Sequence, residues 1–244
     1  MKKILTLSAI ILLSSLLLMA QENKKKNPVS GGLYLKGGVS WTMSDSKSLL
    51  PPKHAHPKLS YGFGATMDWN FSQNFSMNIS AGICNLGGTT EFKYGLVGLT
   101  DDDKQVIPSV GDSLTHSYKF STSYIEVPIG IKGCTNEIGY FTYFLKLGAD
   151  PMFRVKSRIT PRIDDAEAQT ITKSTNLLNI GWFVGGGFEW ALAGNTKLVA
   201  ELVYLGTFLD FDKIKSLKEE NGGYNEFNPS IKFNDISLKV GIVF

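Results

Sequence analysis

The sequence predicts an all-β fold: an eight-stranded antiparallel up-and-down transmembrane β-barrel, preceded by a cleaved signal peptide. Apolar and polar residues alternate with a period of two in eight segments, the pattern of strands whose two faces differ. Long and short connections alternate between these segments, as in barrels with short turns at one rim and longer loops at the other. One face of every segment carries no Asp, Glu, Lys or Arg, which suits contact with lipid.

The beginning of the chain predicts export. Residues 1–20 combine Lys2 and Lys3 with an apolar run and a closing Ala20, which is the pattern of a signal peptide cleaved after that alanine. Residues 21–30 are polar and rich in lysine, and we expect a flexible periplasmic lead-in before a barrel domain over residues 31–244. Of 25 basic and 22 acidic residues, two basic ones belong to the signal, so the mature chain is nearly neutral. No run of lysine and arginine interleaved with aromatic residues indicates a nucleic-acid-binding face.

The first three strands follow this lead-in. Leu33–Trp41 alternates and is followed by a long polar loop, Met43–Lys58, which contains a Pro-Pro pair. Leu59–Trp69 alternates again and ends at a tight polar turn, Asn70–Asn74. Phe75–Cys84 forms the third strand, and its pattern predicts a continuation above the membrane through Glu91 to Tyr94.

The fourth and fifth strands flank the second short turn. A long loop, Gly95–Ser117, leads to a strand that ends in Tyr124–Lys132. The turn Gly133–Gly139 then reverses the chain into Phe141–Arg154, which is followed by another long polar loop, Lys156–Asn176.

The last three strands complete the barrel. Ile180–Trp190 is joined to Leu198–Leu205 by a short turn, Ala191–Asn195. A last long loop, Asp210–Ile231, precedes the closing strand, Ile236–Phe244, whose apolar parity ends on an aromatic residue. We expect this closing strand to pair with the first one, because closure removes free sheet edges.

The charged side chains of the strands predict a closed lumen. They share the face opposite the apolar one, and they are Lys36, Asp68, Glu126, Lys132, Lys146, Asp150, Arg154, Glu189, Glu201 and Lys239. Five are basic and five acidic, and buried charges need partners. Because eight strands leave an interior that side chains just fill, we expect ion pairs in a plugged barrel without an open aqueous pore.

Aromatic residues predict two girdles at the membrane interfaces. The residues expected there include Trp41, Trp69, Phe75, Phe141, Phe153, Trp182 and Trp190. The alternative is that aromatic residues are simply common in strands.

Several motifs resemble the PorT-like outer-membrane β-barrel family. The segment Y-I-E-V-P-I-G-I-K at Tyr124–Lys132 is similar to the family's Y-L-E-I-P-L-L-L-K, and Gly181–Trp190 and Ala200–Tyr204 lie where the family has G-x-G-x-E-Y and E-x-R-Y. This chain differs at Val203, where the family often has an inward Arg. The resemblance implies the barrel fold, a link to type IX protein secretion in one branch, and a role for Phe244 in the signal read by the outer-membrane assembly machinery.

Other candidate sites are weak. His54, His56 and His116 fall in expected external loops, and with Asp101–Asp103 they match no strong metal motif. Ser117 beside His116 would point to the opposite face of a strand, so the pair does not form a catalytic dyad. Cys84 and Cys134 are expected far apart, as free thiols.

These observations favour a non-enzymatic integral protein of the bacterial outer membrane, with no cofactor, metal or catalytic residue, periplasmic termini and external long loops. It would act structurally, or through its external loops and envelope partners. The expected partners are outer-membrane lipid, the assembly machinery, and secretion-system or other envelope proteins, but not nucleic acid. The alternatives are an accessory subunit of type IX secretion, an enzyme at the outer rim, and a soluble lipocalin-like barrel with the faces reversed.

Overall fold

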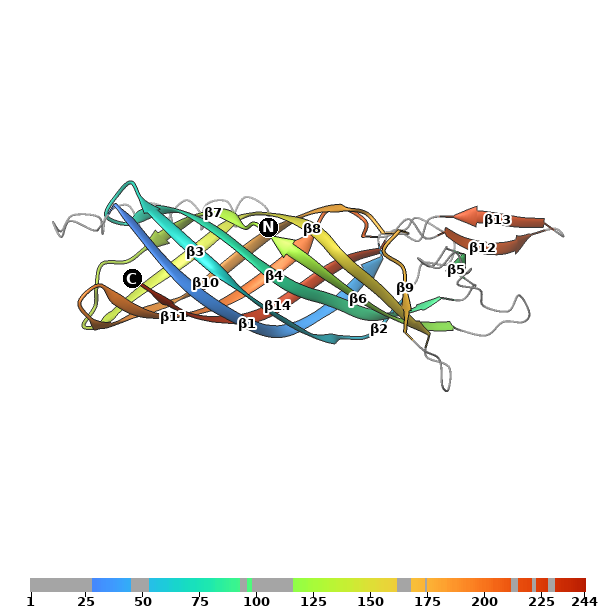
Figure 1. Ribbon diagram of the computed structural model, residues 1–244, viewed down its shortest axis with the longest axis horizontal. Coiled ribbons are helices and arrows are strands. Elements are labelled where there is room, and N and C mark those ends of the chain that lie inside the picture. The colour runs from blue at the N-terminus through green and yellow to red at the C-terminus, as the bar shows by residue number, and fades with distance from the viewer. Residues whose placement is uncertain are drawn as a thin grey trace, which may run out of the picture.

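The computed structural model is a closed antiparallel β-barrel, which confirms the eight-stranded up-and-down fold (Figure 1). The structure describes residues 28–44, 53–92, 96–97, 116–161, 168–173, 175–211, 215–220, 223–227 and 231–244, so the expected signal peptide lies outside the described residues. The strands are β1 Val29–Ser44, β2 Lys53–His56, β3 Lys58–Asn70, β4 Phe75–Phe92, β5 Leu96–Val97, β6 His116–Glu126, β7 Ile129–Cys134, β8 Phe141–Pro161, β9 Gln169–Thr170, β10 Leu178–Ala193, β11 Thr196–Thr207, β12 Lys215–Glu220, β13 Gly223–Phe227 and β14 Ile231–Val243.

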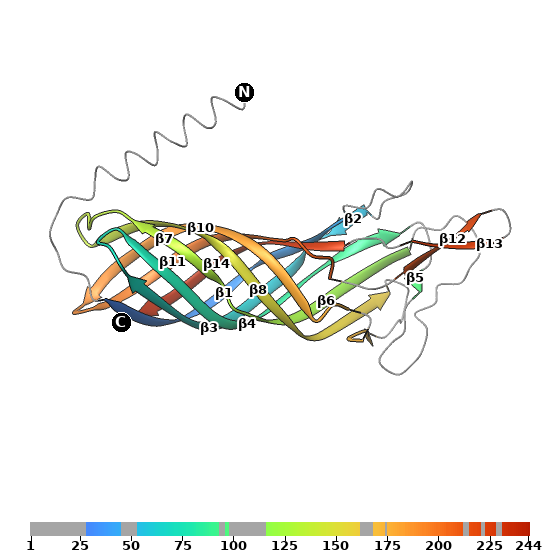
Figure 2. The same ribbon diagram turned by 90° about the horizontal axis from the view of Figure 1, so that it is seen from above.

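The barrel wall follows the order of the chain. Neighbours around the ring are β1, β3, β4, the β6 and β7 pair, β8, β10, β11 and β14, and β14 pairs with β1 in a register that sets Leu35 opposite Val240. The three short turns and Phe244 lie at one end, which we call the turn rim; the other end, near β2 and β9, is the loop rim (Figures 1 and 2). Gly139 and Gly194 have φ of 67° and 59° in two of these turns, a conformation that favours glycine.

The two faces of the wall separate as the alternation predicts. Leu59 on the outward face is 75% exposed, whereas Lys132 on the inward face is 5% exposed. This arrangement is the reverse of a soluble barrel, because the apolar side chains point out and the charged ones point in. No helix among the described residues is long and apolar enough to cross a membrane.

The expected fourth strand is interrupted. Its two halves, β6 and β7, both pair with β4 and β8, and they are separated by Val127 and Pro128. Proline has no N–H to donate to the ladder, so regular pairing stops there. The wall stays closed, because the Ser80 amide donates to the Pro128 carbonyl at 2.9 Å and the Val127 amide donates to the Pro151 carbonyl at 2.9 Å.

The strands are longer at the loop rim than the alternation predicts. All four expected long loops contain strand: β2 lies in the first, β5 and the start of β6 lie in the second, β8 runs on into the third, and the last contains β12 and β13 before β14 starts at Ile231. Those boundaries were wrong because the apolar–polar contrast ends before the strand does. In upper β4, Asn85 and Thr89 on one face and Thr90 on the other are all polar and buried. The first strand likewise begins at Val29, inside the expected lead-in, because Val29 pairs with Trp69.

Candidate functional site in the barrel interior

A cluster of ion pairs fills the interior nearest the turn rim. The ammonium of Lys132 lies 2.7 Å from Asp68 Oδ2 and also contacts Glu189 Oε1, and these three side chains come from β7, β3 and β10. Lys197 of β11 adds a second cation at 2.7 Å from Glu189 Oε2. The Nδ2 of Asn78 donates to Asp68 Oδ1 at 2.5 Å. One buried lysine therefore links two carboxylates across the lumen, which is the pairing that buried charges require.

Two more ion pairs cross the middle of the lumen. Lys36 of β1 lies 2.5 Å from Glu126 Oε2 of β6, and the hydroxyl of Tyr34 donates to Glu126 Oε1 at 3.0 Å. Lys146 of β8 lies 2.8 Å from Glu201 Oε2 of β11. Because Glu126 is 1% exposed and Glu201 2% exposed, their charges depend on these protein partners rather than on bulk water.

Two glycines make room for the contact between Tyr34 and Glu126. Tyr34, Gly64, Gly82 and Glu126 occupy one register row across β1, β3, β4 and β6. A Cβ at Gly64 or Gly82 would lie 2.7 or 2.6 Å from the Tyr34 hydroxyl. The aromatic ring can therefore reach across two strands only because both intervening residues lack a side chain.

Substitution of Gly82 by alanine is expected to lower the free energy of unfolding by about 1–3 kcal/mol, because the new methyl group overlaps the Tyr34 hydroxyl and the Phe63 carbonyl. Gly37→Ala is the matched control, since a Cβ at Gly37 meets nothing within 4 Å. Urea unfolding of the barrel from lipid vesicles measures both variants. Equal stability of the two would contradict this account of the row.

Small cavities lie between the charged side chains of the described interior. Two cavities of about 30 Å³ each lie among the charged side chains; one is bordered by Lys36, Asp150 and Asp235, the other by Asp68, Lys132 and Tyr34. A cavity of that size holds one or two water molecules. Each of these two cavities therefore solvates individual charges but is too small to form an aqueous path by itself.

Three of the ten predicted lumen residues depart from the expected ion pairing. The ammonium of Lys239 lies 3.6 Å from the centre of the Tyr34 ring, and Arg154 donates to the carbonyls of Thr172 and Thr175. Neither residue, nor Asp150, has an ion-pair partner among the described residues. The physical reason is position. Lys239 stands between Lys36 and Glu201 in the ladder, but Glu201 is already paired with Lys146, and Arg154 lies where the chain folds back over the loop rim.

The set of charged strand residues left out three residues of this interior. They are Tyr34, Lys197 and Asp235. Tyr34 and Lys197 lie at inward-facing positions of their strands, so the alternation of faces was the signal that could have identified them. Asp235 lies between the expected loop Asp210–Ile231 and the expected strand Ile236–Phe244, where no parity was read.

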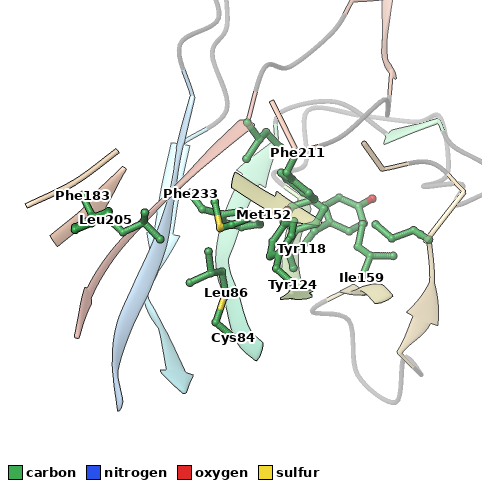
Figure 3. Packing of buried hydrophobic residues seen from close by; sticks show 13 residues of the cluster. Cys84, Leu86, Tyr118, Tyr124, Met152, Ile159, Phe183, Leu205, Phe211 and Phe233 are labelled. Atoms are coloured by element: carbon green, nitrogen blue, oxygen red, sulfur yellow. The ribbon is translucent and has the colours of Figure 1, made fainter. Parts of the chain in front are cut away.

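An apolar plug fills the interior from the level of Lys146 toward the loop rim. We use this name for the buried cluster of Cys84, Leu86, Tyr118, Phe120, Tyr124, Met152, Ile159, Ile171, Phe183, Leu205, Phe211, Ile231 and Phe233 (Figure 3). Phe211, just after β11, folds inward so that its ring centre lies 4.5 Å from that of Phe233 and 5.1 Å from that of Phe120. The interior thus changes from charged near the turn rim to apolar near the loop rim.

The predicted girdle residues fall into two groups. Tyr204 packs between Trp41 and Trp182, with ring centres 6.3 and 5.3 Å away, and this group lies toward the loop rim. At the turn rim, Phe141 stacks on Trp190 at 6.0 Å. Of the other predicted members, Trp69 and Phe153 are exposed, and Phe75 is half-buried.

The weaker candidate sites do not assemble. His54 and His56 belong to β2 and His116 begins β6, so these histidines lie in strands rather than in the expected loops; Asp101–Asp103 lie outside the described residues. Ser117 donates to Glu91 at 3.4 Å. Among the described residues no three His, Cys, Asp or Glu side chains gather as a metal site, and Cys84 and Cys134 are buried and form no disulfide.

Comparison with known proteins adds a family. The sequence profile described as "Outer membrane protein beta-barrel domain" matches residues 19–212. A search of curated proteins found no match.

Several solved structures are similar to this chain. OprG from Pseudomonas aeruginosa is 13% identical, with 88% of this chain and 92% of that one covered and a TM-score of 0.42. A major outer membrane protein from Thermus thermophilus is 12% identical, with 89% and 100% covered and a TM-score of 0.47. Ail, the attachment invasion locus protein of Yersinia pestis, is 13% identical, with 89% and 100% covered and a TM-score of 0.37.

Proposed function

Because the chain belongs to the outer membrane protein beta-barrel domain family, we propose that it is a non-enzymatic integral barrel of the bacterial outer membrane that does not conduct. The observation that carries this proposal is the filled interior, in which buried ion pairs and the apolar plug leave cavities of only about 30 Å³. Such a barrel acts as a rigid support, and contacts with partners fall to its outer face and its loop rim.

The proposed orientation places the turn rim in the periplasm and the loop rim outside the cell. Outer-membrane barrels have short periplasmic turns and longer external loops. The exposed apolar side chains of the outward face, such as Leu35 and Leu147, would then contact lipid. Phe244, 60% exposed and tied by its amide to the Gly31 carbonyl at 2.8 Å, would lie at the periplasmic rim as part of the assembly signal.

The purified barrel is expected to show no stable single-channel conductance in planar bilayers, because ion pairs and the apolar plug occlude the lumen. Recordings at high salt measure this, with an open porin as the positive control. A stable, large conductance would contradict the proposal. Membrane fractionation with heat-modifiable gel mobility tests membrane residence separately, and an extractable soluble protein would favour the lipocalin-like alternative.

A role as an accessory subunit of type IX secretion is the second proposal. It is supported by the PorT-like segment Tyr124–Lys132, which forms the junction of β6 and β7 and contributes Glu126 and Lys132 to the ion pairs. Deleting the gene should then abolish secretion of type IX cargo. Normal secretion would contradict this second proposal, and only the first one would remain. An outer-rim enzyme would need a Ser-His or metal cluster; among the described residues no three metal-ligating side chains gather, and Ser117 donates to Glu91.

A further inference from the structure

A patch of basic side chains lies on the outward face of the wall near the loop rim. We call the set Lys58, Lys119, Lys156, Arg158, Ser121 and Ser123 the external basic patch. Ser123 stands in register with Lys156, and two residues farther along the strands Ser121 stands in register with Arg158. The side chains of Lys119, Lys156 and Arg158 are exposed, and Lys58 donates to Asn85 Oδ1 at 2.6 Å and to Ser121 Oγ at 2.5 Å.

A β-bulge turns two of these cations outward. Between the pairs Tyr124–Arg154 and Ser123–Lys156, β8 contains one extra residue, Val155. Without Val155 as an extra residue, Ser157 and Ile159 would face outward like Phe153, yet both of these side chains are fully buried. Lys156 and Arg158 take the outward positions instead. Bulges commonly re-aim side chains in this way, and here the result is a concentration of positive charge.

The patch has no carboxylate partner in the part of the chain that the structure describes. No described Asp or Glu lies within 4 Å of the nitrogens of Lys58, Lys119, Lys156 or Arg158. The acidic side chain of this part of the wall, Glu91, stands in the row of Ser117, closer to the rim, and accepts the hydroxyl of Ser117. Four positive charges beside two serine hydroxyls form an anion-binding surface.

The height of the patch above the apolar band indicates that the anion belongs to a lipid head group. Directly below it, Ile83, Ile125 and Phe153 form one register row and are exposed. The row of Ser123 and Lys156 is two or three residues along the strands, about 7–10 Å at 3.3 Å per residue, and strand tilt reduces the vertical rise. This height corresponds to the head-group layer, which adds roughly 5–8 Å on each side of the hydrocarbon core.

We propose that the external basic patch binds the phosphate groups of a phosphorylated glycolipid in the external leaflet. The proposal rests on the orientation given under the proposed function. Arg158 and the lysines would contact phosphate oxygens, while Ser121 and Ser123 are placed for sugar hydroxyls. The lipid would thereby seal the wall along the upper parts of β4, β6 and β8.

The test measures lipid binding to the purified, folded barrel in mild detergent by native mass spectrometry. The probes are diphosphorylated lipid A, its enzymatically dephosphorylated form, phosphatidylglycerol and inorganic phosphate. The wild type should bind diphosphorylated lipid A in preference to the other three. Lys156→Gln/Arg158→Gln should weaken that binding about 25-fold, because each basic residue near a charged membrane surface accounts for roughly fivefold.

The matched control is Lys173→Gln/Lys232→Gln, which removes two charges near the loop rim outside the patch and should leave binding unchanged. Raising salt from 50 to 500 mM should weaken binding to the wild type, which tests the proposal even where a variant does not fold. Equal binding of the dephosphorylated lipid or of phosphatidylglycerol, no effect of the patch variant, or no effect of salt would overturn it. Heat-modifiable mobility of the same samples reports the folded barrel, so a soluble or unfolded protein would count against the proposed function instead.

Discussion

Replacing Lys132 with methionine is expected to lower the free energy of unfolding of the barrel by about 3–5 kcal/mol. The ammonium of Lys132 is held between Asp68 and Glu189, and all three side chains are at most 6% exposed. Methionine keeps the length of the chain but leaves Asp68 without its cation and Glu189 with Lys197 alone. Two carboxylates in a nearly dry interior are then insufficiently paired, which is the source of the large loss.

Urea unfolding from lipid vesicles, followed by tryptophan fluorescence, measures this change. Lys239→Met is the matched control, because Lys239 is also inward-facing but contacts the Tyr34 ring and has no ion-pair partner among the described residues. The control loses a cation–π contact and the attraction of Glu201 on one side of the ladder, but it relieves the repulsion from Lys36 on the other side, so we expect a change within about 1 kcal/mol. Similar losses in both variants would show that burial of any lysine, rather than the linked ion pairs, determines stability.

A compensating variant separates pairing from packing. The variant Lys132→Met/Asp68→Asn/Glu189→Gln replaces both carboxylates with neutral amides. Much of the lost stability should return, because no strongly underpaired anion remains. If the triple variant is no more stable than Lys132→Met, the loss arises from the shape of the new side chain.

Substitution of Phe211 by alanine is expected to have an effect of similar size, about 3–5 kcal/mol, because it removes a fully buried ring from the centre of the apolar plug. The ring packs against Phe233 and Phe120, and backbone hydrogen bonds join Phe211 to Asn176 and Ile231. These neighbours belong to rigid strands and to a tied segment, so the cavity is expected to stay open rather than collapse.

Phe208→Ala is the control for that substitution. Phe208 lies three residues earlier, outside the plug, and is 57% exposed, so its loss should cost about 1 kcal/mol or less. Thermal unfolding in detergent compares the two, and limited proteolysis tests whether the loop rim opens first in Phe211→Ala. Equal stability of the two variants would mean that the plug does not close the loop rim.

Much of the fold could be predicted because lipid imposes a simple rule on each strand separately. A charged side chain facing lipid costs roughly 2–4 kcal/mol, so Leu33–Trp41 and Ile236–Phe244 show their faces in their own residues. The same rule stops at the loop rim. There β8 continues with Lys156 and Arg158 outside and Ile159 inside. The apolar face no longer points outward, so the rule for lipid-facing strands does not mark this part of the strand.

The candidate site was predicted as a set of residues but not as a set of contacts. The inward parity identifies Lys36, Glu126 and Lys132 as lumen residues. Which charges meet depends on strand order and stagger around the ring, and these join residues such as Lys36 and Glu126 that are 90 positions apart. The apolar plug was missed because Phe211 and Ile171 lie in stretches that the sequence assigned to loops, and Phe233 lies between the last of these loops and the closing strand.

The sequence by itself determined the class of fold, the closed order of eight strands, and which face of each strand meets lipid. These properties follow from local alternation and from connection lengths, and both can be read along the chain. Only the tertiary structure decided that Lys132 joins two carboxylates, that Lys239 lies over the Tyr34 ring, and that Val155 is a bulge. The reason is that register and curvature arise from the closure of the whole ring, where one extra residue in β8 reverses the faces of every residue that follows it.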